Sequence, residues 1–383
     1  MKKNLKIAFV SPGDPNDKRS WSGTAFSLMQ ALGKHVGETE WLRLDPPSMM
    51  KHRKLLSKLS FRVSGRRGYP DRTLKVSQSY AEQLSKKLTE GNYDLIFASA
   101  ASVEMACVKT SIPIVYVSDA TFSLVKNIYP IFSNLSDDTQ KAEEFFEQSM
   151  INNSSLLVYP SYWAAKSATQ DYGADSSKLR VLPFGANLSS VPDIKDVIHK
   201  KTGDQVNLLF LGKEWERKGG PIAVETLKEL LGRGVNAKLT ICGVIPPENC
   251  DHPQIEVIPY LDKNSQTGRD RLNEILSESH FLLVPSRAEC YGMVFCEANA
   301  YGIPVLAAEV GGIPSIVING ENGYLLPLEA RAHEYANVIA GIVNDENKYS
   351  SLVQNSKTRY DKILNWDNWG KTMRCAITEE LGI

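Results

Sequence analysis

The chain has 383 residues, of which 42% are hydrophobic and 23% charged, so it is globular and longer than one hydrophobic core usually fills. Its 44 basic and 44 acidic residues balance, which excludes the overall positive field that favours nucleic acid. The six cysteines include no C-x-x-C pair, and no apolar run approaches the roughly 20 residues of a membrane span. The N-terminus leads directly into a strand without a signal peptide, so we expect a cytoplasmic protein.

Short apolar runs alternate with longer amphipathic segments along the whole chain. Runs this apolar suit strands that are buried on both faces, and helices between them imply parallel βαβ units. The expected strands are Leu5–Ser11, Asp94–Ser99, Ile114–Ser118, Ser155–Pro160, Arg180–Pro183, Val206–Gly212, Lys238–Gly243, Ile255–Pro259, Phe281–Pro285, Pro304–Ala307 and Gly323–Leu326. The pattern predicts an α/β fold.

The polar segment Ser189–Asp204 interrupts this alternation and precedes a fresh strand, so we predict a linker between two domains there. The N-terminal domain then spans residues 1–190 and the C-terminal domain residues 191–363. We expect a last helix, covering residues 364–383, to pack back on the first domain. Parallel sheets of this kind bind ligands outside the carboxyl ends of their strands.

Two polar sites follow expected strands in the first domain. Gly23, flanked by Ser22 and Thr24, lies in a loop between the opening strand and an amphipathic helix, an arrangement that many unrelated proteins share. Asp119 follows the strand Ile114–Ser118, where its carboxylate could face a ligand; the alternative is that Ser118 or Asp119 caps the next helix.

The segment 51–72 carries eight Lys or Arg residues against one Asp, with apolar residues interleaved. Such a segment suits an anionic lipid surface, which would place the protein at the inner face of a membrane, or a charged acceptor. A solvated loop is the third interpretation.

A basic loop, KEWERKGG, follows the strand that opens the second domain. Its cations are Lys213, Arg217 and Lys218, and they suit a phosphate-bearing ligand. No carboxylate-x-carboxylate motif of the metal-binding kind accompanies them, which favours protein cations over a bound metal. The alternative is a solvated loop that caps a helix.

The most informative stretch is FLLVPSRAECYGMVFCEANA, in which a strand, a loop with Glu289, a glycine turn at Gly292 and a helix follow one another. Glycine permits a tight turn and close approach of a ligand, and the amides of Met293 and Val294 at the helix N-terminus favour a phosphate. Glu297, one turn further on, is placed to accept hydrogen bonds from a ribose diol. The alternative is that both glutamates merely favour the start of the helix.

This block is similar to the E-x7-E signature of the retaining glycosyltransferases of family 4, which have the GT-B fold. The motifs GGIP, from Gly311, and NGENGYL, from Asn319, resemble the stretch that this family carries just downstream. Order and spacing match across the C-terminal half. The resemblance implies two Rossmann-like parallel-sheet domains that face an interdomain cleft.

The resemblance also implies an activity. The chain would be a hexosyltransferase that moves a sugar, with retention, from a nucleotide diphosphate donor such as UDP-glucose or GDP-mannose to a glycan, lipid-linked or small-molecule acceptor, without metal or cofactor. Lys213 and Lys218 match the Arg and Lys that the family aims at the diphosphate. Lys213 in place of Arg loses bidentate phosphate binding, for which Arg217 could compensate. Glu289 would then hold the sugar hydroxyls and Glu297 the ribose.

In the first domain the resemblance gives roles to the loop residues. Gly23 would approach the donor phosphate, with Ser22 and Thr24 on the acceptor side. Asp119 stands where many relatives have a His that bonds the transferred sugar, and Asn187 ends a turn similar to the family's P-x-G-x-D/N. Two other functions stay open: a sugar-nucleotide 2-epimerase, and a non-catalytic protein that binds sugar nucleotides.

Overall fold

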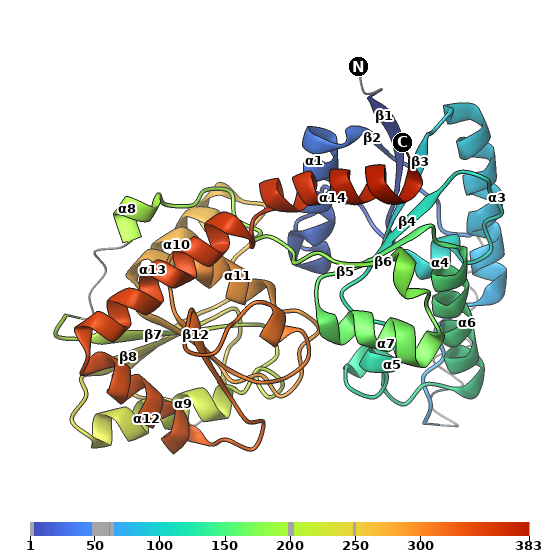
Figure 1. The fold of residues 1–383 in the computed structure, drawn as a ribbon. Coiled ribbons are helices and arrows are strands. Elements are labelled where there is room, and N and C mark those ends of the chain that lie inside the picture. The colour runs from blue at the N-terminus through green and yellow to red at the C-terminus, as the bar shows by residue number, and fades with distance from the viewer. Residues whose placement is uncertain (1–3, 48–60, 62–64, 198–202, 248–249, 383) are drawn as a thin grey trace. The chain divides into compact units, whose positions relative to one another are not determined.

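The computed structural model describes residues 4–47, 61, 65–197, 203–247 and 250–382. The chain divides into two compact units (Figure 1). Unit 1 comprises Met1–Leu182 and Gly370–Ile383, and unit 2 comprises Pro183–Trp369. Each unit is built on one six-stranded sheet.

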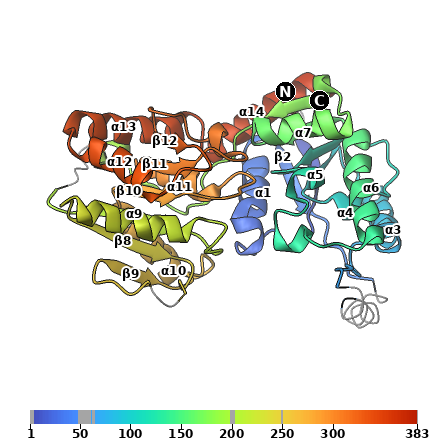
Figure 2. The same cartoon turned by 90° about the horizontal axis from the view of Figure 1, so that it is seen from below.

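The sheet of unit 1 has the strand order β2-β1-β3-β4-β5-β6, and all neighbouring strands are parallel. Its elements are β1 (Leu5–Val10), η1 (Ser20–Gly23), α1 (Thr24–His35), β2 (Gly37–Trp41), α3 (Leu74–Gly91), β3 (Leu95–Ser99), α4 (Ser102–Met105), β4 (Ile114–Val117), α5 (Phe122–Val125), η2 (Pro130–Phe132), α6 (Asp137–Asn153), β5 (Leu156–Tyr159), α7 (Tyr162–Tyr172), η3 (Ser176–Lys178) and β6 (Leu179–Val181). Helices lie on both sides of this sheet (Figure 2). The central strands are therefore buried on both faces, as Ile96 and Phe97 of β3 illustrate.

Unit 2 repeats this plan with the strand order β12-β11-β10-β7-β8-β9, again parallel throughout. Its elements are α8 (Ile194–Val197), β7 (Val206–Leu211), α9 (Gly220–Gly232), β8 (Ala237–Cys242), β9 (Ile255–Ile258), α10 (Gln266–Glu278), β10 (Phe281–Val284), α11 (Met293–Ala300), β11 (Val305–Ala308), η4 (Ile313–Ser315), β12 (Gly323–Leu326), α12 (Ala332–Val343) and α13 (Glu346–Lys362). The predicted α/β fold with two Rossmann-like parallel sheets is confirmed.

Strand β2 is the one described strand that the sequence did not predict. Its residues, Gly37–Trp41, read GETEW and alternate between buried or half-buried and exposed positions. The strand lies at the edge of the sheet and pairs only with β1, so it needs no continuous apolar run. A search for apolar runs therefore passes over it.

The two units divide earlier in the chain than the predicted linker. The segment after Leu182 is bound within unit 2, since Ala186 N–H donates to the Leu364 carbonyl at 3.0 Å and Trp366 Nε1 donates to Asn187 Oδ1 at 3.0 Å. The stretch predicted as a linker carries α8, in which Val197 is buried.

Helix α14 (Trp366–Leu381) runs from unit 2 into unit 1. Its unit 1 part packs on α1 at Gly370, where a Cβ atom would lie 2.5 Å from His35 Cδ2. Arg374 Nη1 donates to the His35 carbonyl at 3.2 Å, and Glu380 forms an ion pair with Arg180 next to β6. A side chain at position 370 would therefore displace the His35 ring.

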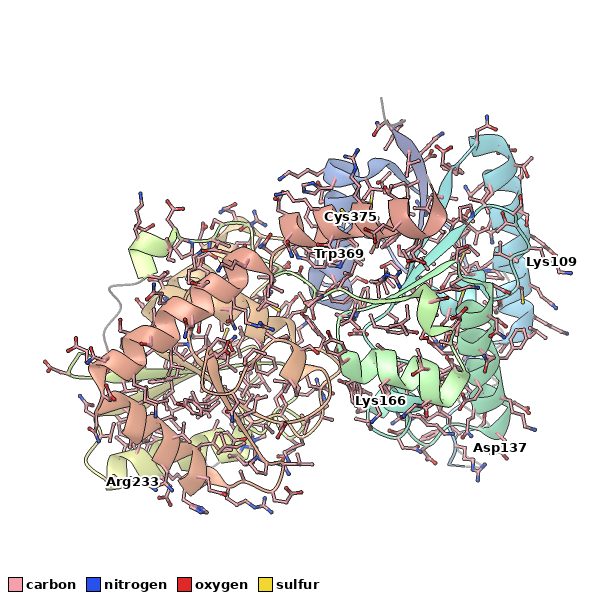
Figure 3. The ribbon with its side chains drawn as sticks, viewed as in Figure 1. Lys109, Asp137, Lys166, Arg233, Trp369 and Cys375 are labelled. Carbon is pink, nitrogen blue, oxygen red and sulfur yellow. The ribbon has the colours of Figure 1, made fainter. Side chains whose placement is uncertain are left out.

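Charged side chains point outward from both units, as Lys109, Lys166 and Arg233 show, whereas Trp369 is buried (Figure 3). Among the helices that the structure describes, none has the length and apolar character needed to cross a bilayer.

Candidate active site

The predicted donor-binding residues of unit 2 come from loops at one edge of its sheet. Strands β7, β9 and β10 are parallel, so the loops that follow them emerge at the same edge. The loop after β7 carries Lys213, Arg217 and Lys218, and the loop after β10 carries Glu289. Parallel topology thus gathers groups that lie far apart in the sequence.

A buried ion pair forms the centre of this edge. Lys218 Nζ donates to Glu289 Oε2, and each side chain is only 9% exposed. Arg217 Nη1 lies 3.7 Å from the same carboxylate oxygen and donates to the Ala288 carbonyl at 2.7 Å. Arg217 Nε also donates to Glu214 Oε2 at 2.7 Å. The loop after β7 and the loop after β10 are therefore joined through charged groups shielded from water, where electrostatic interactions are strong.

Gly311 and Gly312 allow the segment that carries them to pack closely against the loop after β10. A Cβ atom at Gly311 would lie 1.7 Å from the Glu289 carbonyl oxygen, and one at Gly312 would lie 2.3 Å from the Cys290 carbonyl oxygen. No side chain fits at either position without displacing the backbone that carries Glu289. This contact is the physical basis of the GGIP motif.

Gly292 turns the chain into helix α11. Its φ of +95° is in the left-handed region that favours glycine, and it is the N-cap of the helix. The amides of Met293 and Val294 open the helix, and the first amides of a helix have no partner within it. This end of α11 therefore offers donors to an anion.

Glu297 on α11 is 1% exposed, and Lys263 Nζ donates to its Oε1 at 2.5 Å. Its other oxygen, Oε2, is buried and has no hydrogen-bond partner among the described residues. Lys263 lies in the loop after β9 and was not predicted from the sequence. The signal that could have found it is a basic residue in the loop after a neighbouring parallel strand.

The two lysines predicted to bind phosphate have different partners in the structure. Lys218 bonds Glu289, whereas Lys213 is exposed and its Nζ lies 4.7 Å from the centre of the Tyr260 ring, a cation–π contact. Tyr260 follows β9 and is 48% exposed. The exposed Lys213 ammonium is therefore available to a ligand that binds at the carboxyl edge of the sheet.

In unit 1, the loop after β1 meets the residue after β4. Trp21 Nε1 donates to Asp119 Oδ2 at 3.1 Å. Trp21, Ser22 and Gly23 have φ values of 45°, 56° and 89°, so three successive residues adopt the left-handed conformation directly before Thr24 opens α1. Strain of this kind in non-glycine residues gathers at functional sites. The predicted glycine loop is thus joined to Asp119 through Trp21, a residue that was not predicted from the sequence.

The helix-capping alternative for Asp119 is wrong. Helix α5 begins after Thr121, which is its N-cap residue. Ser118 Oγ instead donates to the Ala120 carbonyl at 2.7 Å, and Asp119 accepts from Trp21.

Two other predicted features have different surroundings. Asn187 belongs to unit 2 and accepts from Trp366, so it is bound to the start of α14. Residues 51–60 and 62–64 of the basic segment lie outside the described residues. Within its described part, Arg66 pairs with Asp137 at 2.5 Å and Arg67 Nη1 donates to the Pro130 carbonyl at 2.6 Å.

The sequence of unit 2 is similar to that of known proteins. Residues 193–359 match the family described as glycosyl transferases group 1. This match includes the basic loop, the Glu289 loop, helix α11 and Lys263. The chain is 26% identical, over 273 residues, to a D-inositol 3-phosphate glycosyltransferase of Rhodococcus erythropolis, covering 67% of this chain and 60% of that protein. The chain thus spans about 60% of the length of the curated relatives that it matches first.

Solved structures match over nearly the whole chain. Sucrose-phosphate synthase from Thermosynechococcus elongatus superposes with a TM-score of 0.69 at 18% identity, covering 99% of this chain and 100% of that one. HepE from Anabaena, solved in complex with UDP and glucose, superposes with a TM-score of 0.63 at 16% identity, covering 98% and 100%. The fold is GT-B, as predicted.

Proposed function

We propose that this protein is a retaining glycosyltransferase that transfers a hexose from a nucleotide diphosphate sugar to an acceptor without a metal ion. The observation that carries the proposal is the buried Lys218–Glu289 pair beside Arg217 at the carboxyl edge of a nucleotide-type sheet. A carboxylate and two cations so close together serve a ligand that has both hydroxyl groups and phosphate charge. The similarity of this part of the chain to glycosyl transferases group 1 supports the same conclusion.

The cations would neutralise the diphosphate as it leaves. An ammonium has three donors, so Lys218 can hold Glu289 with one and reach a phosphate oxygen with another. Arg217 and Lys213 would add charge, and the amides of Met293 and Val294 would bind the anion at the start of α11. Protein cations would thus take the place of a divalent metal.

Glu289 would hold hydroxyl groups of the transferred sugar. In a front-face displacement the bond from the sugar's anomeric carbon to the donor phosphate oxygen breaks, and a bond to the acceptor oxygen forms on the same face. The departing phosphate oxygen takes the acceptor's proton, so no protein side chain need act as general base. Asp119 would stabilise the positive charge that develops on the sugar ring.

The donor would be a sugar nucleotide, with UDP-glucose and GDP-mannose as first candidates. Solved relatives described as bound to UDP and to UDP-glucose support the first of these. Glu297 would receive the ribose, because its second oxygen is buried beside the same edge and accepts no bond from the described residues.

The test is product analysis by mass spectrometry with a panel of donors and acceptors, in buffer that contains EDTA. The proposal expects a glycosylated acceptor with retained anomeric configuration and undiminished yield in EDTA. Loss of activity on chelation would refute metal independence. Deuterium at C2 of a UDP-N-acetylhexosamine incubated in D2O would instead indicate an epimerase, and tight nucleotide binding without any product would indicate a binding protein.

A further inference from the structure

The carboxylate of Glu297 is held by a lysine from a separate loop. Lys263 Nζ lies 2.5 Å from Glu297 Oε1, and the two residues are 34 positions apart in the sequence. The glutamate is 1% exposed and the lysine side chain 26% exposed. A carboxylate this deeply buried is costly unless a cation accompanies it, and Lys263 forms an ion pair with Glu297.

The backbone around Lys263 is fixed by its own loop. Arg269 Nη1 donates to the carbonyl of Lys263 at 2.9 Å and to that of Asn264 at 2.8 Å. Ser265 Oγ donates to the Asp262 carbonyl at 2.9 Å, and a Cβ atom at Gly268 would lie 2.2 Å from that same oxygen. The first turn of α10 thus holds the loop in place, so the ammonium is positioned before any ligand binds.

The pair lies where the segments that follow β9 and β10 meet: Lys263 is in the loop after β9, and Glu297 is on α11, which follows β10. Cys242, the last residue of β8, has its pKa raised to about 11 by burial, with the charges of Lys263 and Glu297 acting on it in opposite directions. The pair therefore occupies the edge at which a parallel sheet binds nucleotides.

The two oxygens of Glu297 have different surroundings. Oε1 accepts from Lys263, while Oε2 is buried and has no partner among the described residues. A buried acceptor without a donor is costly in the free protein, and a ligand hydroxyl that reaches it removes that cost. A nucleotide that binds at this edge carries its hydroxyl groups on the ribose.

We infer that Lys263 is a positioning residue for the donor ribose: it orients Glu297 through Oε1 and leaves Oε2 for a ribose hydroxyl. This inference rests on the proposed function, because it concerns the nucleotide of the same donor. The cations at the carboxyl edge of the unit 2 sheet then have two different roles. Lys218 and Arg217 act on the diphosphate, whereas Lys263 acts on the ribose through Glu297 and need not touch the ligand.

The test pairs a side-chain change with a ligand change. UDP, GDP and ADP are first titrated into the wild-type protein by calorimetry, and the one that binds is compared with its 2′,3′-dideoxy analogue. Lys263→Met should weaken binding of the parent nucleotide by at least about tenfold, the value of one charge-assisted hydrogen bond. The dideoxy analogue, which has no hydroxyl for Glu297, should bind wild type and variant within about twofold.

Three further variants secure the interpretation. Lys263→Arg keeps a cation and should retain most of the preference for the ribose hydroxyls. The double change Lys263→Met with Glu297→Leu removes both charges and the acceptor for the ribose, so it should fold and bind the two nucleotides equally. Lys228→Met, which removes an exposed lysine that pairs with Glu225 at 2.8 Å, should change neither affinity.

The outcomes separate this inference from the proposed function. If Lys263→Met weakens the parent and dideoxy nucleotides equally, Lys263 acts on the phosphates or on the fold, and the inference is wrong while the proposed function stands. If no nucleoside diphosphate binds the wild-type protein, the proposed function fails and this inference fails with it.

Discussion

Raising the pH should destabilise unit 1 through Glu147 of α6. This residue is 5% exposed, its Oε2 accepts from Tyr116 Oη at 3.4 Å, and its Oε1 has no partner among the described residues. Burial, with an added contribution from the charge of Glu143, raises the pKa of Glu147 from 4.5 to about 8. Because the folded state keeps a proton that the unfolded state has lost, the contribution of Glu147 to stability is greatest below pH 4.5 and falls as the pH rises through about 8.

The size of this effect follows from the two pKa values. Each pKa unit corresponds to about 1.4 kcal/mol, so ionisation costs about 5 kcal/mol over the whole range and about 2 to 3 kcal/mol between pH 6 and pH 9. Glu147→Gln keeps the shape of the side chain and removes the charge. The stability of the variant should therefore fall much less at high pH than that of the wild-type protein.

Hydrogen exchange measured by mass spectrometry on the full chain can follow unit 1 by itself. Peptides from β4 and β5, corrected for intrinsic exchange rates, should lose protection between pH 6 and pH 9 in the wild-type protein and much less in Glu147→Gln. Glu82→Gln is the matched control, because Glu82 is an exposed glutamate of unit 1 on α3 and is not among the charges that act on Glu147. An identical loss of protection in wild type and Glu147→Gln would refute the reasoning.

Three further predictions concern the candidate active site. Glu289→Gln should lower kcat far more than it weakens nucleotide binding, as steady-state kinetics and calorimetry will show; equal losses would mean that Glu289 contributes uniform binding. Gly311→Ala should lower the thermal unfolding temperature and abolish donor binding, because its Cβ would lie 1.7 Å from the Glu289 carbonyl oxygen. Gly341→Ala, in α12 with no atom within 4 Å of the added Cβ, should instead stabilise by about 0.5 to 1 kcal/mol, and a similar loss in both variants would contradict the steric argument. Trp21→Phe removes the donor to Asp119 and should lower kcat about tenfold at unchanged nucleotide affinity, since one hydrogen bond to a charged group is lost; unchanged kcat would remove Trp21 from the site.

The sequence predicted what local pattern controls. Eleven of the twelve described strands coincide with runs rich in apolar residues, as the central strands of a parallel sheet require, whereas the edge strand β2 (GETEW) has no such run. Gly292 and the start of α11 were found because a turn, a helix and their charges follow one another within a few residues.

Partners from distant segments could not be predicted in the same way. Lys218 and Glu289 were both identified, but their direct bond depends on two loops that are 71 residues apart in the sequence. The partners of Lys263 and Trp21 cannot be identified locally, because Lys263 contacts a helix 34 residues later and Trp21 contacts a strand end 98 residues later. The boundary at Leu182 depends on the hydrogen bonds of residues 186 and 187 to the other end of unit 2.

Unit 1 includes the late segment Gly370–Ile383, and this has a consequence for synthesis of the chain. Translation delivers all of unit 2 before the residues that pack against His35 of α1 and pair with Arg180. A nascent chain that stops before Gly370 would hold a finished second unit and a first unit whose α1 surface is still uncovered. The first unit to be made is thus the last to be completed.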